Sequence, residues 1–382
     1  MLRGETKCEK FPPLTRALRE QRSRGTVDIR ALFSRSRPSH HVPVPRPILV
    51  ADDPRFDGHQ SSRPHPERPE RLAAARAGLK AALPPERRRD LTLRKASDEA
   101  IERVHRPGYA GALRGALAQG SGDLDPDTYF CPETGESTWL AAGAAADLAD
   151  ALVRDPGERA IALLRPPGHH ARPGTPMGFC LINNVAVAAA AARASGLARV
   201  AIVDWDVHHG NGTQEIFEAD DSVLFVSLHQ HPFYPGTGSP RETGKGAGRG
   251  ATVNVGFPAG TGSEAYGEAF RRVVLPRLTA FDPELVLVSA GYDAHERDPL
   301  AGLSLEAATF GAMATALDDF CGESRSLGFF LEGGYDLQAL EGSVAATTRA
   351  LTGEARVELP EGEPSARERE AIEATLAAHR QP

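Results

Sequence analysis

Short apolar runs alternate with alanine-rich segments of helical character through most of this 382-residue chain. Strands separated by helices form a parallel sheet with helices on both faces, so the pattern predicts an α/β fold. The runs expected to be strands are residues 48–51, 160–164, 200–203, 223–228, 252–255, 285–289 and 328–331. The segments expected to be helices are residues 67–83, 139–153, 184–194, 263–278 and 305–320.

Composition limits the class of protein. The chain is long enough for one large domain with extensions. No apolar run reaches the roughly 20 residues that span a bilayer, and no short apolar segment with a cleavage site begins the chain. The four cysteines (Cys8, Cys131, Cys180 and Cys321) are scattered and form no CxxC pair. This usage favours a reducing cytoplasm and argues against a cysteine-bound zinc.

The N-terminal region is basic: residues 1–46 hold eleven Lys or Arg against four acids. We expect residues 1–47 to be a flexible basic extension rich in Pro and Ser, 48–352 the main folded domain, and 353–382 a C-terminal helix or tail. A weak anchor to nucleic acid or a membrane surface, or a transit peptide, is the alternative for the extension. We expect no specific nucleic-acid partner and no membrane span.

Four of the expected strands end in polar clusters. Ligands of open α/β sheets bind outside the carboxyl ends of the strands, so these clusters should meet in one crevice. A lone Asp or His after a strand is usually a cap or a structural residue, but four aligned clusters make that interpretation weak. The clusters are Arg165-Pro-Pro-Gly-His169-His170, Asp204 to His209, Ala290-Gly-Tyr-Asp293 and Glu332-Gly-Gly-Tyr335.

The donor types indicate a metal site. Asp206, His208 and Asp293 offer oxygen, nitrogen and oxygen ligands, which leaves a position on a divalent cation open to water or substrate. Carboxylates and imidazoles are poor neighbours in a core but good neighbours around a cation. Zn²⁺ is the expected metal, with Fe²⁺ or Co²⁺ also suited to these ligands.

The remaining polar residues predict hydrolysis. His169 and His170 offer an acid and a base that titrate near neutrality, with Asp204 and Asn211 nearby to orient their rings. Tyr335 supplies a neutral phenolic donor for a developing oxyanion. Together with a metal, these groups indicate hydrolysis of an amide or ester without a Ser or Cys nucleophile.

Several motifs resemble the zinc-dependent histone deacetylase family, which includes bacterial histone-deacetylase-like amidohydrolases and acetylpolyamine amidohydrolases. They are RPPGHHA (165–171), GFCLINN (178–184), VDWDVHHGNG (203–212), PGTG (235–238), SAGYD (289–293) and EGGY (332–335). The likeness runs from about residue 48 to residue 350, and Asn211 and HPERPER (65–71) are similar to class II members. The resemblance implies the arginase-like three-layer fold, with an eight-stranded, mainly parallel sheet.

The resemblance also implies roles for individual residues. His170 would be the general base, His169 its electrostatic or acid partner, and Tyr335 the carbonyl-polarising group. The substrate tunnel would involve Asp127, Gly178, Phe179, Tyr234 (where Phe is more usual) and Leu300, and Arg71 would lie near an acetate-release cavity. One structural K⁺ or Na⁺ site would use Asp204, Ser227, Leu228 and the carbonyls of Asp206 and His208; a second would use the carbonyls of Phe217, Asp220 and Val223.

The leading hypothesis is metal-dependent hydrolysis of N-acetyl-lysine or a related acylated amine. An acetylpolyamine amidohydrolase is the alternative with the same chemistry, although the aliphatic Leu300 favours acyl-lysine. A non-catalytic acyl-lysine binding protein would have no use for Tyr335, and a dinuclear ureohydrolase would need metal ligands that HHGNG does not supply. The sequence leaves open the acyl group, the resident metal and the oligomeric state.

Overall fold

A computed structural model describes residues 47–380. Its centre is an eight-stranded sheet in the order β2-β1-β5-β10-β9-β6-β7-β8, and every neighbouring pair is parallel. A two-stranded antiparallel ribbon, β3-β4, lies apart from it. The strands are β1 (Ile48–Ala51), β2 (Arg88–Asp90), β3 (Gly122–Asp123), β4 (Tyr129–Phe130), β5 (Arg159–Ala162), β6 (Val200–Asp204), β7 (Val223–Gln230), β8 (Thr252–Phe257), β9 (Leu285–Ala290) and β10 (Ser326–Leu331).

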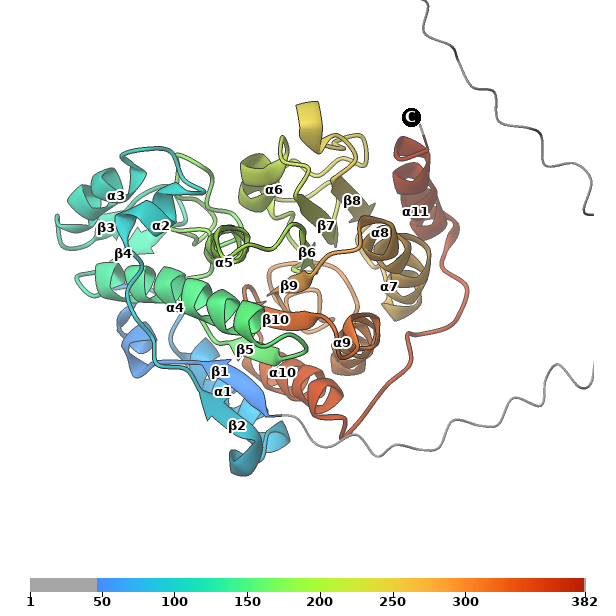
Figure 1. The fold of residues 1–382 in the computed structure, drawn as a ribbon, viewed down its shortest axis with the longest axis horizontal. Coiled ribbons are helices and arrows are strands. Elements are labelled where there is room, and N and C mark those ends of the chain that lie inside the picture. The colour runs from blue at the N-terminus through green and yellow to red at the C-terminus, as the bar shows by residue number, and fades with distance from the viewer. Residues whose placement is uncertain (1–46, 381–382) are drawn as a thin grey trace, which may run out of the picture. The chain divides into compact units, whose positions relative to one another are not determined.

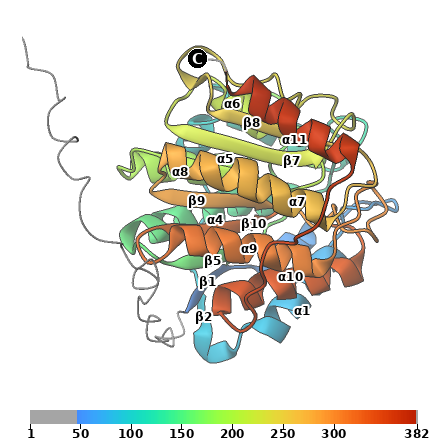
Figure 2. The same cartoon turned by 90° about the vertical axis from the view of Figure 1, so that its right-hand side faces the viewer.

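Helices cover both faces of the sheet (Figures 1 and 2). One layer contains α4 and α5, which pack on each other; the other contains α1, α10, α9 and α7, each in contact with the next. The helices are α1 (Glu70–Ala82), α2 (Asp98–Glu102), α3 (Tyr109–Leu117), α4 (Thr134–Arg154), α5 (Asn184–Ala194), α6 (Asn211–Phe217), α7 (Ser263–Ala269), α8 (Leu275–Phe281), α9 (Ala307–Cys321), α10 (Leu337–Thr352) and α11 (Ala366–Ala378).

The composition of the central strands explains this three-layer arrangement. Every residue of β6, β7, β9 and β10 is buried. A strand covered on both faces needs a continuous apolar run rather than an alternating one. These four segments are largely continuous apolar runs. The expected α/β fold with helices on both faces is therefore confirmed.

The structure adds elements that the apolar pattern did not predict. The edge strand β2 has the sequence Arg-Arg-Asp and carries no apolar signal. Helix α10 was also not predicted. The segment expected as one helix over 263–278 is α7 and α8 joined by a π-helical turn, Phe270–Val274.

The structure describes the two ends of the chain to different extents. The predicted basic extension, residues 1–47, lies outside the described residues except for Pro47. The predicted C-terminal helix or tail, residues 353–382, contains α11, which lies against the edge strand β8 (Figure 2). Within residues 47–380, no helix is both long and apolar enough to cross a membrane.

Candidate active site

The carboxyl ends of four neighbouring strands bring the polar clusters together. The register pairs Asp204 of β6 with Ser289 of β9, and Ser289 with Phe330 of β10, so the loops after these strands leave the sheet at the same edge. β5 lies beside β10 and leads into the His169-His170 loop. The structure thus places all four clusters at one edge, as the parallel topology requires.

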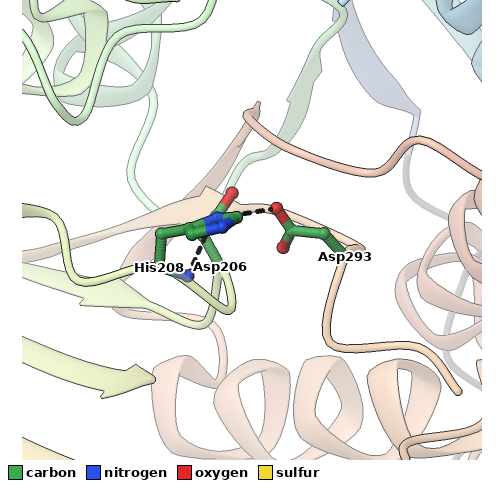
Figure 3. Close-up of side chains that lie close together, drawn as sticks. All are labelled: Asp206, His208 and Asp293. Atoms are coloured by element: carbon green, nitrogen blue, oxygen red, sulfur yellow. Dashed lines mark hydrogen bonds and ion pairs between the residues drawn. The ribbon is translucent and has the colours of Figure 1, made fainter. Parts of the chain in front are cut away.

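Asp206, His208 and Asp293 converge at this edge (Figure 3). Each offers a ligand atom, and these atoms all lie within 4.8 Å of one another. Nδ1 of His208 is 3.2 Å from Oδ1 of Asp206 and 3.2 Å from Oδ2 of Asp293. All three residues are buried, so their charges need a compensating partner.

The hydrogen bonds of the two carboxylates leave an oxygen available for a cation. Oδ1 of Asp293 accepts the N–H of Val207 (2.9 Å), but its Oδ2 is buried and accepts no hydrogen bond, although Nδ1 of His208 lies 3.2 Å away. The Asp206 carboxylate is fixed by the N–H groups of His208 (2.9 Å) and Gly333 (2.8 Å). An orphaned carboxylate oxygen beside a fixed carboxylate and an imidazole is what a three-ligand divalent metal site needs.

The two histidines have different polar partners. Nδ1 of His169 lies 3.0 Å from Oδ2 of Asp204, whereas Nδ1 of His170 lies 2.7 Å from the amide oxygen of Asn211. The ring centroids are 4.0 Å apart. The two rings therefore share one site but face different charges on their far nitrogens.

These surroundings move the two pKa values in opposite directions. Burial opposes the charged form of His169, but Asp206, Asp204 and Glu332 outweigh it and raise the pKa of His169 well above its usual value. Burial, together with the neighbouring His169 and His208, lowers the pKa of His170 well below its usual value. A neutral imidazole beside a charged one is suited to a base with an electrostatic partner.

Tyr335 completes the site. Its N–H donates to Oδ2 of Asp298 (2.6 Å), and the guanidinium carbon of Arg71 lies 4.8 Å from its ring centroid. Burial raises the pKa of Tyr335 well above its usual value, so the hydroxyl keeps its proton as a donor. Arg71 donates to the carbonyls of Gly334 (2.6 Å) and Glu332, which holds it against this tyrosine. Its expected place near an acetate-release cavity stays a prediction.

A cavity of about 190 Å³ lies at this edge of the sheet. It is lined by every residue that the sequence assigned to the tunnel, namely Asp127, Gly178, Phe179, Tyr234 and Leu300, together with His169, His170, His208 and Tyr335. Phe233, Cys180, Pro167 and Gly333 line it as well and were not predicted. Phe233 stacks on the His208 ring at 5.5 Å between centroids, and the available signal was its place beside Tyr234 in HPFYPGTG.

The residues expected around structural monovalent cations lie in two places. Asp204 and Ser227 are register partners on β6 and β7, and Leu228 follows on β7. Phe217, Asp220 and Val223 lie between the end of α6 and the start of β7, where the Phe217 carbonyl accepts the Asp220 N–H at 2.9 Å. Cation binding at both places stays a prediction.

The parallel sheet, the buried Asp-His-Asp cluster at its carboxyl edge and the cavity beside it define a protein of the arginase/deacetylase fold. The histone deacetylase domain family matches residues 65–351, and the chain belongs to this family.

Individual relatives agree with this assignment. The crystal structure of the HDA15 HD domain superimposes with a TM-score of 0.81 at 39% identity, covering 87% of this chain and 95% of that one. Histone deacetylase 15 of Arabidopsis thaliana is 43% identical over 77% of this chain and 54% of its own length. Polyamine deacetylase HDAC10 of Homo sapiens is 38% identical over 82% of this chain and 48% of its own. The chain therefore spans about half the length of these two relatives.

Proposed function

We propose that this protein is a metal-dependent amidohydrolase that acts in the cytoplasm and removes the acyl group from N-acetyl-lysine or a related acylated amine. The observation that carries the proposal is the 190 Å³ cavity, because His169, His170, His208 and Tyr335 all line it. Its walls include Phe179, Phe233 and Leu300, which suit a neutral amide on an aliphatic stem. The cytoplasmic location rests on three buried free cysteines among the described residues (Cys131, Cys180 and Cys321).

Asp206, His208 and Asp293 would hold the metal, for which Zn²⁺ is the first choice and Fe²⁺ or Co²⁺ the alternatives. When bound, the metal supplies Lewis acidity to the substrate carbonyl and to the attacking water.

The protein's own groups then divide the proton transfers. His170 takes the proton of the attacking water, because its lowered pKa keeps it neutral and Asn211 fixes the ring. As the C–N bond breaks, His170 gives this proton to the amine nitrogen, so that a carboxylic acid and a free amine leave the site. His169, held charged by Asp206, Asp204 and Glu332, stabilises the negative charge that develops beside it. The Tyr335 hydroxyl donates a hydrogen bond to the carbonyl oxygen as that oxygen gains charge.

An acetylated polyamine is the second candidate substrate, favoured by one acid in the cavity wall, Asp127, and a second acid beside it, Asp125. Asp127 lines the cavity, and its N–H donates to Oδ1 of Asp125 at 3.0 Å, which keeps the second carboxylate close. These acids would attract the ammonium groups of a polyamine. Leu300 weighs against this substrate, because it offers no counter-charge inside the cavity.

A turnover screen with metal analysis tests the proposal. The purified protein is assayed on acetyl-lysine peptides, longer acyl-lysine peptides and N8-acetylspermidine. We expect acetyl-lysine peptide to have the highest kcat/KM; a preference for the polyamine would instead support the second candidate. Absence of turnover on every acylated amine by metal-loaded protein would contradict both.

Two variants separate the metal from the tyrosine. Asp293→Ala should lose metal and activity together, because an open site with three protein ligands has no spare one. Tyr335→Phe should keep its metal while kcat falls on the order of 10²–10³, the usual effect of losing one oxyanion donor. Stoichiometric metal with normal turnover in Asp293→Ala would refute the ligand assignment, and a Tyr335→Phe enzyme with half its kcat would place carbonyl polarisation elsewhere.

A further inference from the structure

One wall of the cavity is built on an unusual turn. Met177 and Cys180 exchange both backbone hydrogen bonds, N–H of Met177 to O of Cys180 (3.0 Å) and N–H of Cys180 to O of Met177 (2.9 Å). The two residues between them both have positive φ, +57° at Gly178 and +69° at Phe179. This is the pattern of a type I′ hairpin turn, which Asn-Gly normally fills.

The second central residue, Phe179, therefore has left-handed backbone angles that residues with a Cβ rarely adopt. Gly178 cannot be replaced by a residue with a side chain, because a Cβ at this position would lie 2.5 Å from Cδ2 of His170. A phenylalanine held in this conformation needs support from outside the hairpin.

The support comes from the loop before β4. The Phe179 N–H donates to Oγ1 of Thr128 (3.1 Å), and the Gly178 N–H donates to Oδ1 of Asp127 (3.2 Å). The Thr128 hydroxyl also donates to Oδ1 of Asp127 (3.1 Å). Thr128 is fully buried, so its hydroxyl is committed to these two contacts, and Oδ1 of Asp125 accepts its N–H (2.6 Å).

The turn determines where an aromatic ring lies relative to the proposed oxyanion donor. The Phe179 ring is edge-on to Tyr335 at 5.9 Å between centroids and edge-on to His65 at 4.8 Å. Both Phe179 and Tyr335 line the cavity. A small change in the turn would therefore alter the width of the cavity beside Tyr335.

We infer that Thr128 is a positioning residue of the tunnel, whose hydroxyl holds the left-handed Gly178-Phe179 turn and so fixes the wall that selects the acyl group. Asp127, with one oxygen accepting from the turn, shares this role from the cavity side. The inference rests on the proposed function for the nature of the substrate but not for the contact itself. It predicts that loosening the turn impairs acetyl-lysine hydrolysis and weakens discrimination between acetyl and longer acyl groups.

The test is a double-mutant cycle between Thr128→Val and Phe179→Ala. Alone, Thr128→Val should lower kcat/KM for an acetyl-lysine peptide about tenfold, mainly through KM, because a buried donor–acceptor pair is lost. Its preference for acetyl over butyryl should fall, whereas Thr128→Ser should retain both properties. In the Phe179→Ala background the same change should cost less than about twofold, since the residue through which it acts is gone.

The control is Thr348→Val, which removes an equally buried hydroxyl that donates only to the Val344 carbonyl within α10. It should lower stability without changing acyl preference. Equal losses from Thr128→Val in both backgrounds, or a loss in Thr348→Val of the same size and selectivity, would overturn the inference. Metal content should stay at the wild-type level throughout.

Hydrogen exchange of the Phe179 amide keeps the inference testable without activity. The amide should exchange slowly in the wild-type protein, and markedly faster in Thr128→Ala, which is used if Thr128→Val does not fold. Fast exchange in the folded wild type would overturn the inference even if the enzyme is active. Slow exchange in a protein that hydrolyses no acylated amine would leave the contact intact and refute the proposed function instead.

Discussion

At the scale of single residues, glycines allow the proposed metal ligands to lie against the backbone. A Cβ on Gly333 would lie 2.0 Å from Oδ2 of Asp293 and 2.6 Å from Oδ2 of Asp206, and a Cβ on Gly291 would lie 2.1 Å from Oδ2 of Asp206. Such contacts cannot be relieved without moving a carboxylate. The glycines of SAGYD and EGGY therefore leave the space in which two charged groups approach one cation.

Gly333→Ala should accordingly disturb metal binding without removing a ligand. We expect metal affinity to fall at least about tenfold and activity with it, the usual range for disturbing a ligand's supporting contacts. Gly342→Ala in α10 is the matched control, because its added Cβ would meet only Ala307 at 3.7 Å, an ordinary contact. Metal titration and thermal unfolding of both variants decide the matter: unchanged affinity in a folded Gly333→Ala protein would show that the carboxylates can move freely.

Among the helices and strands, the sequence predicted those whose apolar residues show where they lie in the fold. Apolar runs identified the central strands, and the residues after them identified the polar edge, because a parallel sheet leaves little freedom at its carboxyl ends. Edge strand β2 was missed because its charged residues form backbone pairs without burying an apolar face. Thr128 was missed because its role depends on a hairpin about fifty residues later in the chain, a contact that no local pattern records.

A buried histidine connects two of these elements. His105, after α2, has its Nδ1 3.0 Å from the Arg172 carbonyl, so that nitrogen carries the proton, and its Nε2 accepts the Asn183 N–H at 3.0 Å. Asn183 in turn caps α5 by accepting the Ala186 N–H (3.0 Å). The neutral imidazole therefore holds the loop that joins the His169-His170 region to α5.

This arrangement predicts a pH-dependent stability. Burial lowers the pKa of His105 to about 4 from an unperturbed value of 6.5. Between these values the unfolded chain binds a proton that the folded chain does not, so the stabilisation is complete above pH 6.5 and is lost as the pH falls toward 4. The contribution amounts to about 3 kcal/mol of unfolding free energy.

Denaturant unfolding between pH 7.5 and 4.5 measures this effect. His105→Gln should be less stable than wild type at pH 7.5, but its stability should fall less steeply with decreasing pH. Thr348→Val, which removes no titratable group, should run parallel to wild type at every pH. If His105→Gln also runs parallel to wild type, the imidazole is not the group that titrates.

At the scale of the whole molecule, the sheet has an edge at β8 that the C-terminal helix covers. Thr375 of α11 donates its hydroxyl to the Asn254 carbonyl of β8 at 2.7 Å, and Ile372 is fully buried in the core. Both residues lie beyond the family match, which ends at residue 351. An uncovered edge strand offers unpaired backbone groups to another chain, so α11 protects the sheet as well as adding apolar contact.

Deleting residues 361–382 should therefore lower the Tm by several degrees and promote self-association through β8. Ile372→Ala should also destabilise the protein, lowering its free energy of unfolding by about 2–5 kcal/mol, the usual cost of truncating a large apolar side chain in a core. Glu370→Ala, on the exposed side of the same helix, should stay within about 0.5 kcal/mol of wild type. Thermal unfolding and light scattering after size exclusion give both readouts. A truncated chain with the Tm and molar mass of the full chain would mean that the β8 edge needs no cover.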